Sequence, residues 1–200
     1  MLRSVIRWTS SSMNFNEAVW PGLAPRFAFA QNVDQLRAAL AQAPAEGMTA
    51  LYDAVYRSLD HLHRGTRDRR VLVIVSDGGD NASAHKLDDV LEYARRTSTV
   101  IYGVMLFDAD NHDAKPGVLK ALARETGGTA FQPKRAQDMM AVFTQIALEI
   151  RSSYSIGFSP PSGSHDGFRT VRVIVADRNQ HSLTARTRGG YVAGRIRQGK

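Results

Sequence analysis

Two side chains that carry oxygen atoms lie at the boundaries of predicted secondary-structure elements. Asp77 directly follows the apolar run 71–75, in Ser76-Asp77-Gly78-Gly79-Asp80-Asn81, and Thr49 follows Gly47 at the start of a helical pattern. A carboxylate, a hydroxyl and water are hard ligands that suit Mg²⁺, Mn²⁺ or Ca²⁺. The pattern therefore indicates a divalent-cation site. The alternative is structural: Thr49 caps a helix and Asp77 starts a turn.

The elements that must position these residues alternate between strand and helix. Apolar runs at 71–75 and 99–106 are typical of strands buried on both faces of a parallel sheet, and 129–131 is a short third strand. Helical periodicity predicts helices over 32–40, 49–62, 86–96, 118–125 and 136–151. This alternation predicts an α/β fold, a Rossmann-like, doubly wound and mostly parallel sheet. Ligands of such sheets bind at the carboxyl ends of the strands.

The pattern changes near residue 153. Segments 154–158, 169–175 and 183–187 are typical of strands with no helix between them, joined by a loop at 160–167 and a turn at 177–180. We therefore predict an α/β domain over 1–152, an antiparallel β-meander over 153–193 and a flexible basic tail over 194–200. The meander serves either as a cap over the domain, which is favoured, or as a partner-binding edge.

Composition narrows the class of protein. The length of 200 residues is enough for one globular domain with a small addition. Hydrophobic residues make up 43% of the chain and charged residues 22%, which is typical of a globular protein. The net charge is +7, but the basic residues are scattered without an aromatic-interleaved stripe, so no nucleic-acid binding is expected. No signal peptide or apolar run of membrane-spanning length is recognised, and the compartment is left unknown.

The sequence contains none of the common motifs that would indicate an enzyme. The chain has no cysteine, which excludes thiolate ligands and cysteine nucleophiles. No Gly-x-Gly-x-x-Gly, Walker or nucleophile-elbow pattern is present. The acid-rich stretch 108–113 departs from the calcium-loop template and is predicted to be a solvated loop. We expect no catalytic residues.

Two motifs resemble a known family. Gly47-Met48-Thr49-Ala50-Leu51-Tyr52-Asp53-Ala54 and the segment from Val73 to Asn81 resemble the second and third segments of the metal-ion-dependent adhesion site of von Willebrand factor A domains. More narrowly, the chain is similar to the bacterial group in which a β-rich tail follows the domain, as in Tyr154-Ser155-Ile156-Gly157-Phe158 and Arg188-Gly189-Gly190-Tyr191. The resemblance covers roughly residues 14 to 193.

The resemblance implies a specific site. One divalent cation would lie at the upper sheet edge, held by Thr49 directly or through water and by Asp77 through water. An acidic side chain of a protein partner commonly completes such a site. The partner-binding edge would be formed by Gly78, Gly79, Asp80 and Asn81.

The family's first motif, Asp-x-Ser-x-Ser, is altered. Ser10 and Ser12 fall on its serine positions, but Trp8 stands at the aspartate position, and indole offers no lone pair to a hard cation. The segment 14–19 resembles the family's third strand region, yet it begins directly after Ser12-Met13. In the family, a helix and another strand lie between the first motif and this region. Either a helix and a strand are deleted or residues 2–13 match by chance. In both cases weak cation binding is expected.

The sequence thus predicts a non-enzymatic protein-binding module with a degenerate cation site for Mg²⁺, Mn²⁺ or Ca²⁺. The alternative is a metal-independent structural or assembly fragment of a larger cell-envelope protein. Loss of a strand and a helix would expose apolar sheet edges, so self-association is a further expectation. Members of the family are often exported or belong to the cell envelope.

Overall fold

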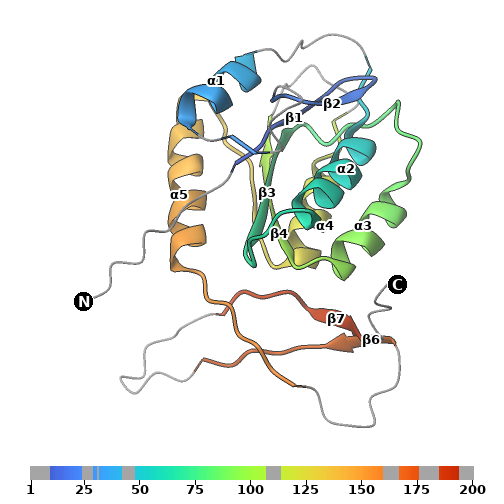
Figure 1. Ribbon diagram of the computed structural model, residues 1–200, viewed down its shortest axis with the longest axis vertical. Coiled ribbons are helices and arrows are strands. Elements are labelled where there is room, and N and C mark those ends of the chain that lie inside the picture. The colour runs from blue at the N-terminus through green and yellow to red at the C-terminus, as the bar shows by residue number, and fades with distance from the viewer. Residues whose placement is uncertain are drawn as a thin grey trace. The chain divides into compact units, whose positions relative to one another are not determined.

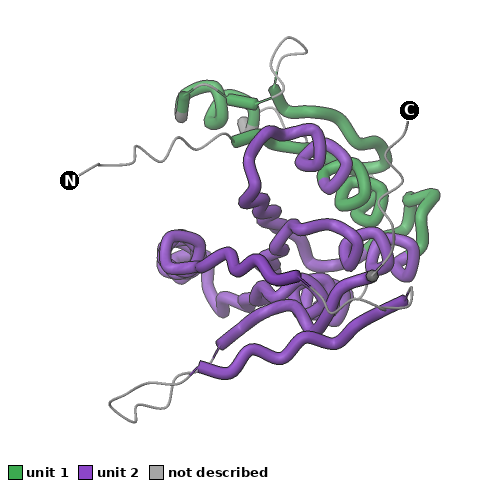
Figure 2. Tube along the Cα trace, turned by 60° about the horizontal axis from the view of Figure 1, so that its bottom comes forward, with its two compact units in different colours: residues 1–58, 80–86 green, residues 59–79, 87–200 purple. Residues whose placement is uncertain are grey.

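The computed structural model describes residues 10–23, 29–30, 32–41, 48–106, 114–159, 167–175 and 185–193. The chain divides into two compact units, one of residues 1–58 and 80–86 and the other of residues 59–79 and 87–200 (Figure 2). Trp8, Gly47 and the predicted strand 2–7, loop 108–113, turn 177–180 and tail 194–200 lie outside the described residues. The predicted boundary between 152 and 153 stays a prediction.

The second unit contains the parallel sheet that the sequence predicts. Its strands are hydrogen-bonded in the order β3-β4-β5, and the register runs from Arg70 opposite Thr99 to Ser76 opposite Met105. The predicted α/β fold class is confirmed. The elements follow one another as β3 (Arg70–Ser76), α3 (Leu87–Arg96), β4 (Thr99–Met105), α4 (Pro116–Thr126), β5 (Ala130–Phe131), the short 3-10 turn η1 (Ala136–Asp138) and α5 (Met139–Ser152).

Helices cover both faces of this sheet, with α5 on one side and α3 and α4 on the other (Figure 1). Leu119 of α4 packs on Gly103 of β4, where a Cβ would lie 2.9 Å from the Leu119 Cβ. On the opposite face, Tyr102 and Val104 pack against Ile146 of α5. Side chains alternate along a strand, so β4 is buried on both faces, as predicted. No helix in the described residues is long and apolar enough to cross a membrane.

The prediction that 71–75 is buried on both faces is wrong. Ile74 is only 5% exposed, whereas Val73 and Val75 keep 38% and 39% of their surface exposed. Val73 lies opposite Tyr102 and Val75 opposite Val104, so both side chains belong to the face that α5 covers. Both valines are exposed because β3 is the terminal strand of the described sheet, whereas α5 packs over β4.

The C-terminal extension is antiparallel, as predicted, but its strands differ from the predicted ones. β6 (Gly167–Thr170) pairs with β7 (Gly190–Ala193), and Arg169 lies opposite Tyr191. The predicted strands at 154–158 and at 171–175 do not form, and the described residues 185–187 are not a strand. Alternating apolar residues indicated strand character there, but pairing depends on contacts between distant residues.

Side chains of the extension contact the α/β part of the second unit. The Arg188 guanidinium donates to the Thr97 carbonyl at 2.8 Å, and Arg186 lies 3.1 Å from the Glu149 carboxylate. Phe158 and Tyr191 meet edge to face, with ring centroids 5.6 Å apart. Burial lowers the pKa of Arg188 from its usual value. The two arginine contacts join the extension to α5 and to the loop before β4, and the ring pair lies within the extension.

The described part of the first unit contains a hairpin of β1 (Met13–Phe15) and β2 (Val19–Pro21), followed by α1 (Val33–Ala41) and the start of α2 (Leu51–His63). The segment 14–19, which resembles the family's third strand region, is not one strand but spans the turn of this hairpin. Asn16 turns the chain instead, because its side-chain oxygen accepts the Ala18 N–H at 3.0 Å.

Candidate functional site

Asp77 begins a tight turn at the carboxyl end of β3. Its Oδ1 accepts the N–H of Gly79 at 2.9 Å, and the N–H of Gly78 donates to Ser76 Oγ at 3.1 Å. Gly78 has a φ of +86°, and a Cβ there would lie 2.2 Å from the Lys115 carbonyl oxygen. The Asp77 carbonyl in turn accepts the Lys115 N–H at 3.1 Å. The turn predicted for Asp77 is therefore present, and it orients the carboxylate.

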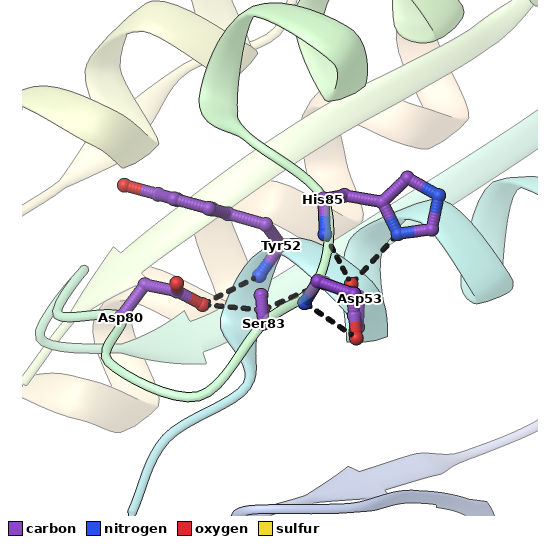
Figure 3. A network of polar contacts seen from close by, with 6 residues as sticks. Tyr52, Asp53, Asp80, Ser83 and His85 are labelled. Carbon is purple, nitrogen blue, oxygen red and sulfur yellow. Dashed lines mark hydrogen bonds and ion pairs between the residues drawn. The ribbon is translucent and has the colours of Figure 1, made fainter.

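In the first unit, the start of α2 is capped by the loop 80–86 (Figure 3). Thr49 donates its N–H to Asn81 Oδ1 at 2.7 Å, and Tyr52 donates its N–H to Asp80 Oδ1 at 3.0 Å. The Asp53 N–H donates to Ser83 Oγ at 3.0 Å. The first N–H groups of a helix have no partner within the helix, so these oxygens satisfy them. A carboxylate there also suits the positive end of the helix dipole.

The Asp53 side chain completes this network from the helix side. Its carboxylate accepts the N–H of Ala84 at 3.1 Å and that of His85 at 3.0 Å, and Oδ1 lies 2.7 Å from His85 Nδ1. The His85 ring stacks on Tyr56 with centroids 4.1 Å apart. Ser83 Oγ donates to Asp80 Oδ1 at 2.5 Å. The loop and the helix therefore hold each other through reciprocal bonds (Figure 3).

Electrostatics agree with this geometry. Burial raises the pKa of Asp53, but the N–H groups of His85 and Ala84 and the His85 imidazole outweigh it, so the pKa is lowered overall. In the second unit, Arg95 Nε donates to Glu125 at 2.9 Å and lowers the pKa of that carboxyl. Burial, and then the charge of Asp80, raise the pKa of Tyr52.

The lowered pKa values of the Asp53 and Glu125 carboxyl groups predict that the fold loses stability in acid. A carboxyl whose pKa is lower in the folded than in the unfolded chain stabilises the fold above its unfolded value, and this stabilisation is lost as the pH falls through the folded pKa. For Glu125 the loss begins near the reference value 4.5, and for Asp53 near 3.8. Urea unfolding measured between pH 7 and pH 2.5 is expected to show it. Glu125→Gln should be less stable at pH 7 and flatter in acid, and an unchanged pH profile would contradict the role of this ion pair.

Ser10 and Ser12 lie near the hairpin of the first unit. The Ser10 carbonyl accepts the Ala30 N–H at 2.5 Å. Ser12 is 8% exposed, and its Oγ has no hydrogen-bond partner among the described residues. A Cβ at Gly22 would lie 2.2 Å from that oxygen, so the Ser12 hydroxyl packs tightly against the Gly22 backbone. No hydrogen bond between described residues joins either serine to Thr49.

The structure thus groups the predicted site residues in two sets. In one set, the Thr49 N–H donates to Asn81, and the Tyr52 N–H, about one helical turn further on, donates to Asp80. In the other set, the Asp77 carboxylate accepts the Gly79 N–H. In the part of the chain that the structure describes, no three histidine, aspartate or glutamate side chains gather closely enough to hold a metal ion. The predicted ligand set relies on hydroxyl oxygens as well, so the roles of Thr49, Asp77, Ser10 and Ser12 as ligands stay predictions.

The network of Asp53, Ser83 and His85 was not predicted. Each is a common capping or surface residue, and the partners are 30 to 32 positions apart in the sequence. Local capping signals join residues only three apart. The one available signal was the run Asp80-Asn81-Ala82-Ser83, which is rich in capping residue types and follows a strand.

Comparisons with known proteins agree with the fold. No protein-family model and no curated protein matches the sequence. Among solved structures, a von Willebrand factor type A protein from Catenulispora acidiphila superposes with a TM-score of 0.57 at 13% identity, over 71% of this chain and 33% of that one. An aerotolerance-related membrane protein from Bacteroides fragilis gives 0.54 at 9%, and the conserved hypothetical protein BatB from Bacteroides thetaiotaomicron 0.51 at 10%; each match spans 72% of this chain and 80% of the other.

The chain spans only one third of the length of the Catenulispora protein, and all three identities lie at or below 13%, so the likeness concerns the fold. It agrees with the parallel sheet flanked by helices and with the family that the motifs around Thr49 and Asp77 resemble. The chain has the fold of a von Willebrand factor A domain, followed by a small antiparallel sheet.

Proposed function

We propose that this chain is a non-enzymatic protein-binding module of the von Willebrand factor A type. The observation that carries the proposal is the Asp77 turn, which stands at the carboxyl end of β3 in a fold of this type. Open α/β sheets bind their ligands at that end. Gly78 and Gly79 bring the backbone into a tight turn beside the carboxylate, which leaves little side-chain bulk in the way of a partner.

The proposed module includes a weak divalent-cation site. On the sequence resemblance, Thr49 and Asp77 supply its protein oxygens, and the bound cation would supply positive charge for an acidic side chain of the partner. The Asp77 carboxylate fits this role because it is a hard ligand and the Gly79 N–H fixes its orientation. Trp8 replaces the aspartate of the first motif, so few protein oxygens remain and affinity is low.

Binding is favoured over catalysis by how the polar groups are used. Asp53 and His85 form a carboxylate–imidazole pair of the kind that hydrolases use. The neighbouring Ser83 hydroxyl, however, donates to Asp80 and accepts the Asp53 N–H. Among the described residues, no serine or threonine hydroxyl is hydrogen-bonded to the His85 ring. The pair therefore acts in holding the loop to the helix.

The alternative, a metal-independent assembly fragment, is favoured by one observation: Val73 and Val75 are partly exposed on β3, which is the terminal strand of the sheet in the described residues. The two proposals differ in their response to chelators. Partner binding through a cation is abolished by EDTA, whereas assembly through a strand edge is not.

The cation site is tested by titrating Mn²⁺ into the protein and following free Mn²⁺ by electron paramagnetic resonance. Weak binding is expected, with a dissociation constant on the order of 10⁻⁴ to 10⁻³ M. Asp77→Ala and Thr49→Ala are each expected to abolish it. The matched control is Asp34→Ala, which removes a carboxylate that is 88% exposed. A micromolar constant would overturn the degenerate character of the site, and equal binding by all variants would overturn the ligand assignment.

A further inference from the structure

The net charge of the chain is concentrated at its C-terminal end. Residues 151–200 contain nine lysines and arginines but two acidic residues, whereas residues 1–150 contain 17 of each kind. The surplus of +7 therefore belongs to the C-terminal extension and to the last residues of α5. A region with this surplus is attracted to anionic surfaces, and the attraction weakens as salt is added.

The hairpin of β6 and β7 has one face that is apolar and exposed. Phe168 lies directly opposite Val192, so both side chains point to the same face, and they are 56% and 40% exposed. The Phe168 ring leans over Gly190, where a Cβ would lie 2.6 Å from Phe168 Cζ. The opposite face carries Tyr191, whose ring contacts Phe158 within the extension.

The chain continues this exposed face beyond β6. The Val171 N–H donates to the Gly189 carbonyl at 3.0 Å, so the hairpin pairing extends past the strand. Side chains of an extended chain alternate, which places Arg172 and Ile174 on the face of Phe168. Ile174 is 77% exposed, and Arg172 is exposed without an ion-pair partner among the described residues. The outer hairpin face thus consists of Phe168, Arg172, Ile174 and Val192, although the solvated face of an antiparallel sheet is ordinarily polar.

The size and charge of the outer hairpin face disfavour a protein partner. Two strands over seven residues cover about 10 Å by 23 Å. Each partner in a stable protein interface contributes roughly 800 Å², which is several times that area. A second copy of the chain is disfavoured as well, because it would bring the same positive charge to the contact.

An anionic bilayer accepts both kinds of side chain on this face. Its headgroups attract arginine, and apolar side chains enter the boundary between headgroups and acyl chains. The apolar stem of an arginine lets the guanidinium stay among the phosphates. Nucleic acids are instead bound by aromatic rings on which bases stack. Ile174 and Val192 offer no such ring.

We propose that the outer hairpin face docks on an anionic phospholipid bilayer, with Phe168, Ile174 and Val192 entering its surface and Arg172 lying among the phosphate groups. The contact lies on the surface of the membrane and involves no spanning helix. It uses neither Thr49 nor Asp77, so it goes beyond the proposed function.

Cosedimentation of the full chain with vesicles tests the docking. Binding is expected to vesicles of phosphatidylcholine that contain one third phosphatidylglycerol, and little binding to pure phosphatidylcholine. Added salt should weaken the binding, and EDTA should leave it unchanged. Arg172→Gln is expected to lower the partition coefficient about fivefold. Ile174→Ser should lower it roughly tenfold, because an exposed apolar side chain no longer leaves water.

Two matched controls lie at the other end of α5 in the same unit. Met140→Ser removes an apolar side chain that is 73% exposed, and Lys134→Gln removes an exposed positive charge. The 14 residues of α5 separate these positions from the extension by about 20 Å. Both controls should bind vesicles within about twofold of the natural chain. Circular dichroism shows whether each variant keeps its fold.

Insertion is measured separately by tryptophan fluorescence. Phospholipids brominated on their acyl chains should quench Ile174→Trp more than Met140→Trp, and the natural tryptophans contribute equally to both variants. Equal quenching would overturn the insertion of this face. Vesicle binding that Ile174→Ser leaves unchanged would overturn it as well.

The docking as a whole is overturned by a natural chain that does not bind the anionic vesicles at low salt. A chain that binds a mixed-sequence oligonucleotide but not the vesicles would assign the basic charge to nucleic acid. Either result would leave the Mn²⁺ titration of Thr49→Ala and Asp77→Ala unaffected, so the failure of this proposal is distinguishable from the failure of the proposed function.

Discussion

Gly78→Ala is expected to destabilise the second unit by about 2–4 kcal/mol. Two effects add. Gly78 has a φ of +86°, a left-handed conformation that alanine adopts at a cost of about 1 kcal/mol. The added Cβ would also lie 2.2 Å from the Lys115 carbonyl oxygen, a backbone atom that moves only together with the start of α4. Relieving that overlap costs about 1–3 kcal/mol more.

Urea unfolding followed by circular dichroism measures this loss, and agreement between near- and far-UV signals shows whether the transition is two-state. Gly117→Ala is the matched control. Gly117 lies in the first turn of α4, and a Cβ there meets no atom within 4 Å. Alanine favours helix by up to about 1 kcal/mol over glycine, so this variant should be as stable as the natural chain or more so. Equal stabilities for the two variants would show that the turn is not constrained as described.

Asp53→Ala is expected to cost the first unit about 2–4 kcal/mol. The carboxylate accepts two N–H groups of the loop and faces the His85 imidazole, and its side chain is 20% exposed. Alanine removes the acceptors and leaves the Ala84 and His85 N–H groups without their partner. Asp53→Asn keeps the shape and one acceptor oxygen, so an intermediate loss is expected from it.

Amide hydrogen exchange locates the effect. Ala84 and His85 should exchange much faster in Asp53→Ala, whereas strand β4 should keep its protection. Asp34→Ala again serves as control, because exposed ion pairs such as that of Asp34 with Arg37 contribute at most about 1 kcal/mol. Unchanged exchange at residues 84 and 85 would mean that the carboxylate does not hold the loop.

Sequence patterns were sufficient for the central fold and insufficient for its edges. The runs that became β3 and β4 are apolar whatever their neighbours are, and the helical periodicity of α3, α4 and α5 repeats over two or more turns. Whether a strand lies inside a sheet or at its end depends on which other strands pair with it. The exposure of Val73 and Val75 therefore could not be predicted from the β3 sequence.

In the candidate site, too, contacts between residues adjacent in sequence could be predicted, whereas contacts between distant residues could not. Asp77 was predicted at the end of β3 because strand and turn are adjacent in sequence, and the Gly79 N–H contact agrees with the turn. Asp80 and Asn81 were predicted as a partner-binding edge from motif resemblance, and the structure shows that both also cap α2. That second role depends on a contact between segments 28 to 32 residues apart, which no local pattern encodes.

The distant origin of the α2 cap has a consequence for how the chain folds during its synthesis. The ribosome produces Tyr52 and Asp53 before Asp80 and His85, which follow their partners by 28 and 32 residues. At translation rates of about 5–20 residues per second, the start of α2 waits roughly 1.5–6 seconds for its cap. The whole of β3 is made in that interval. The nascent helix therefore emerges uncapped, and its first turn becomes secure only after β3 has been translated.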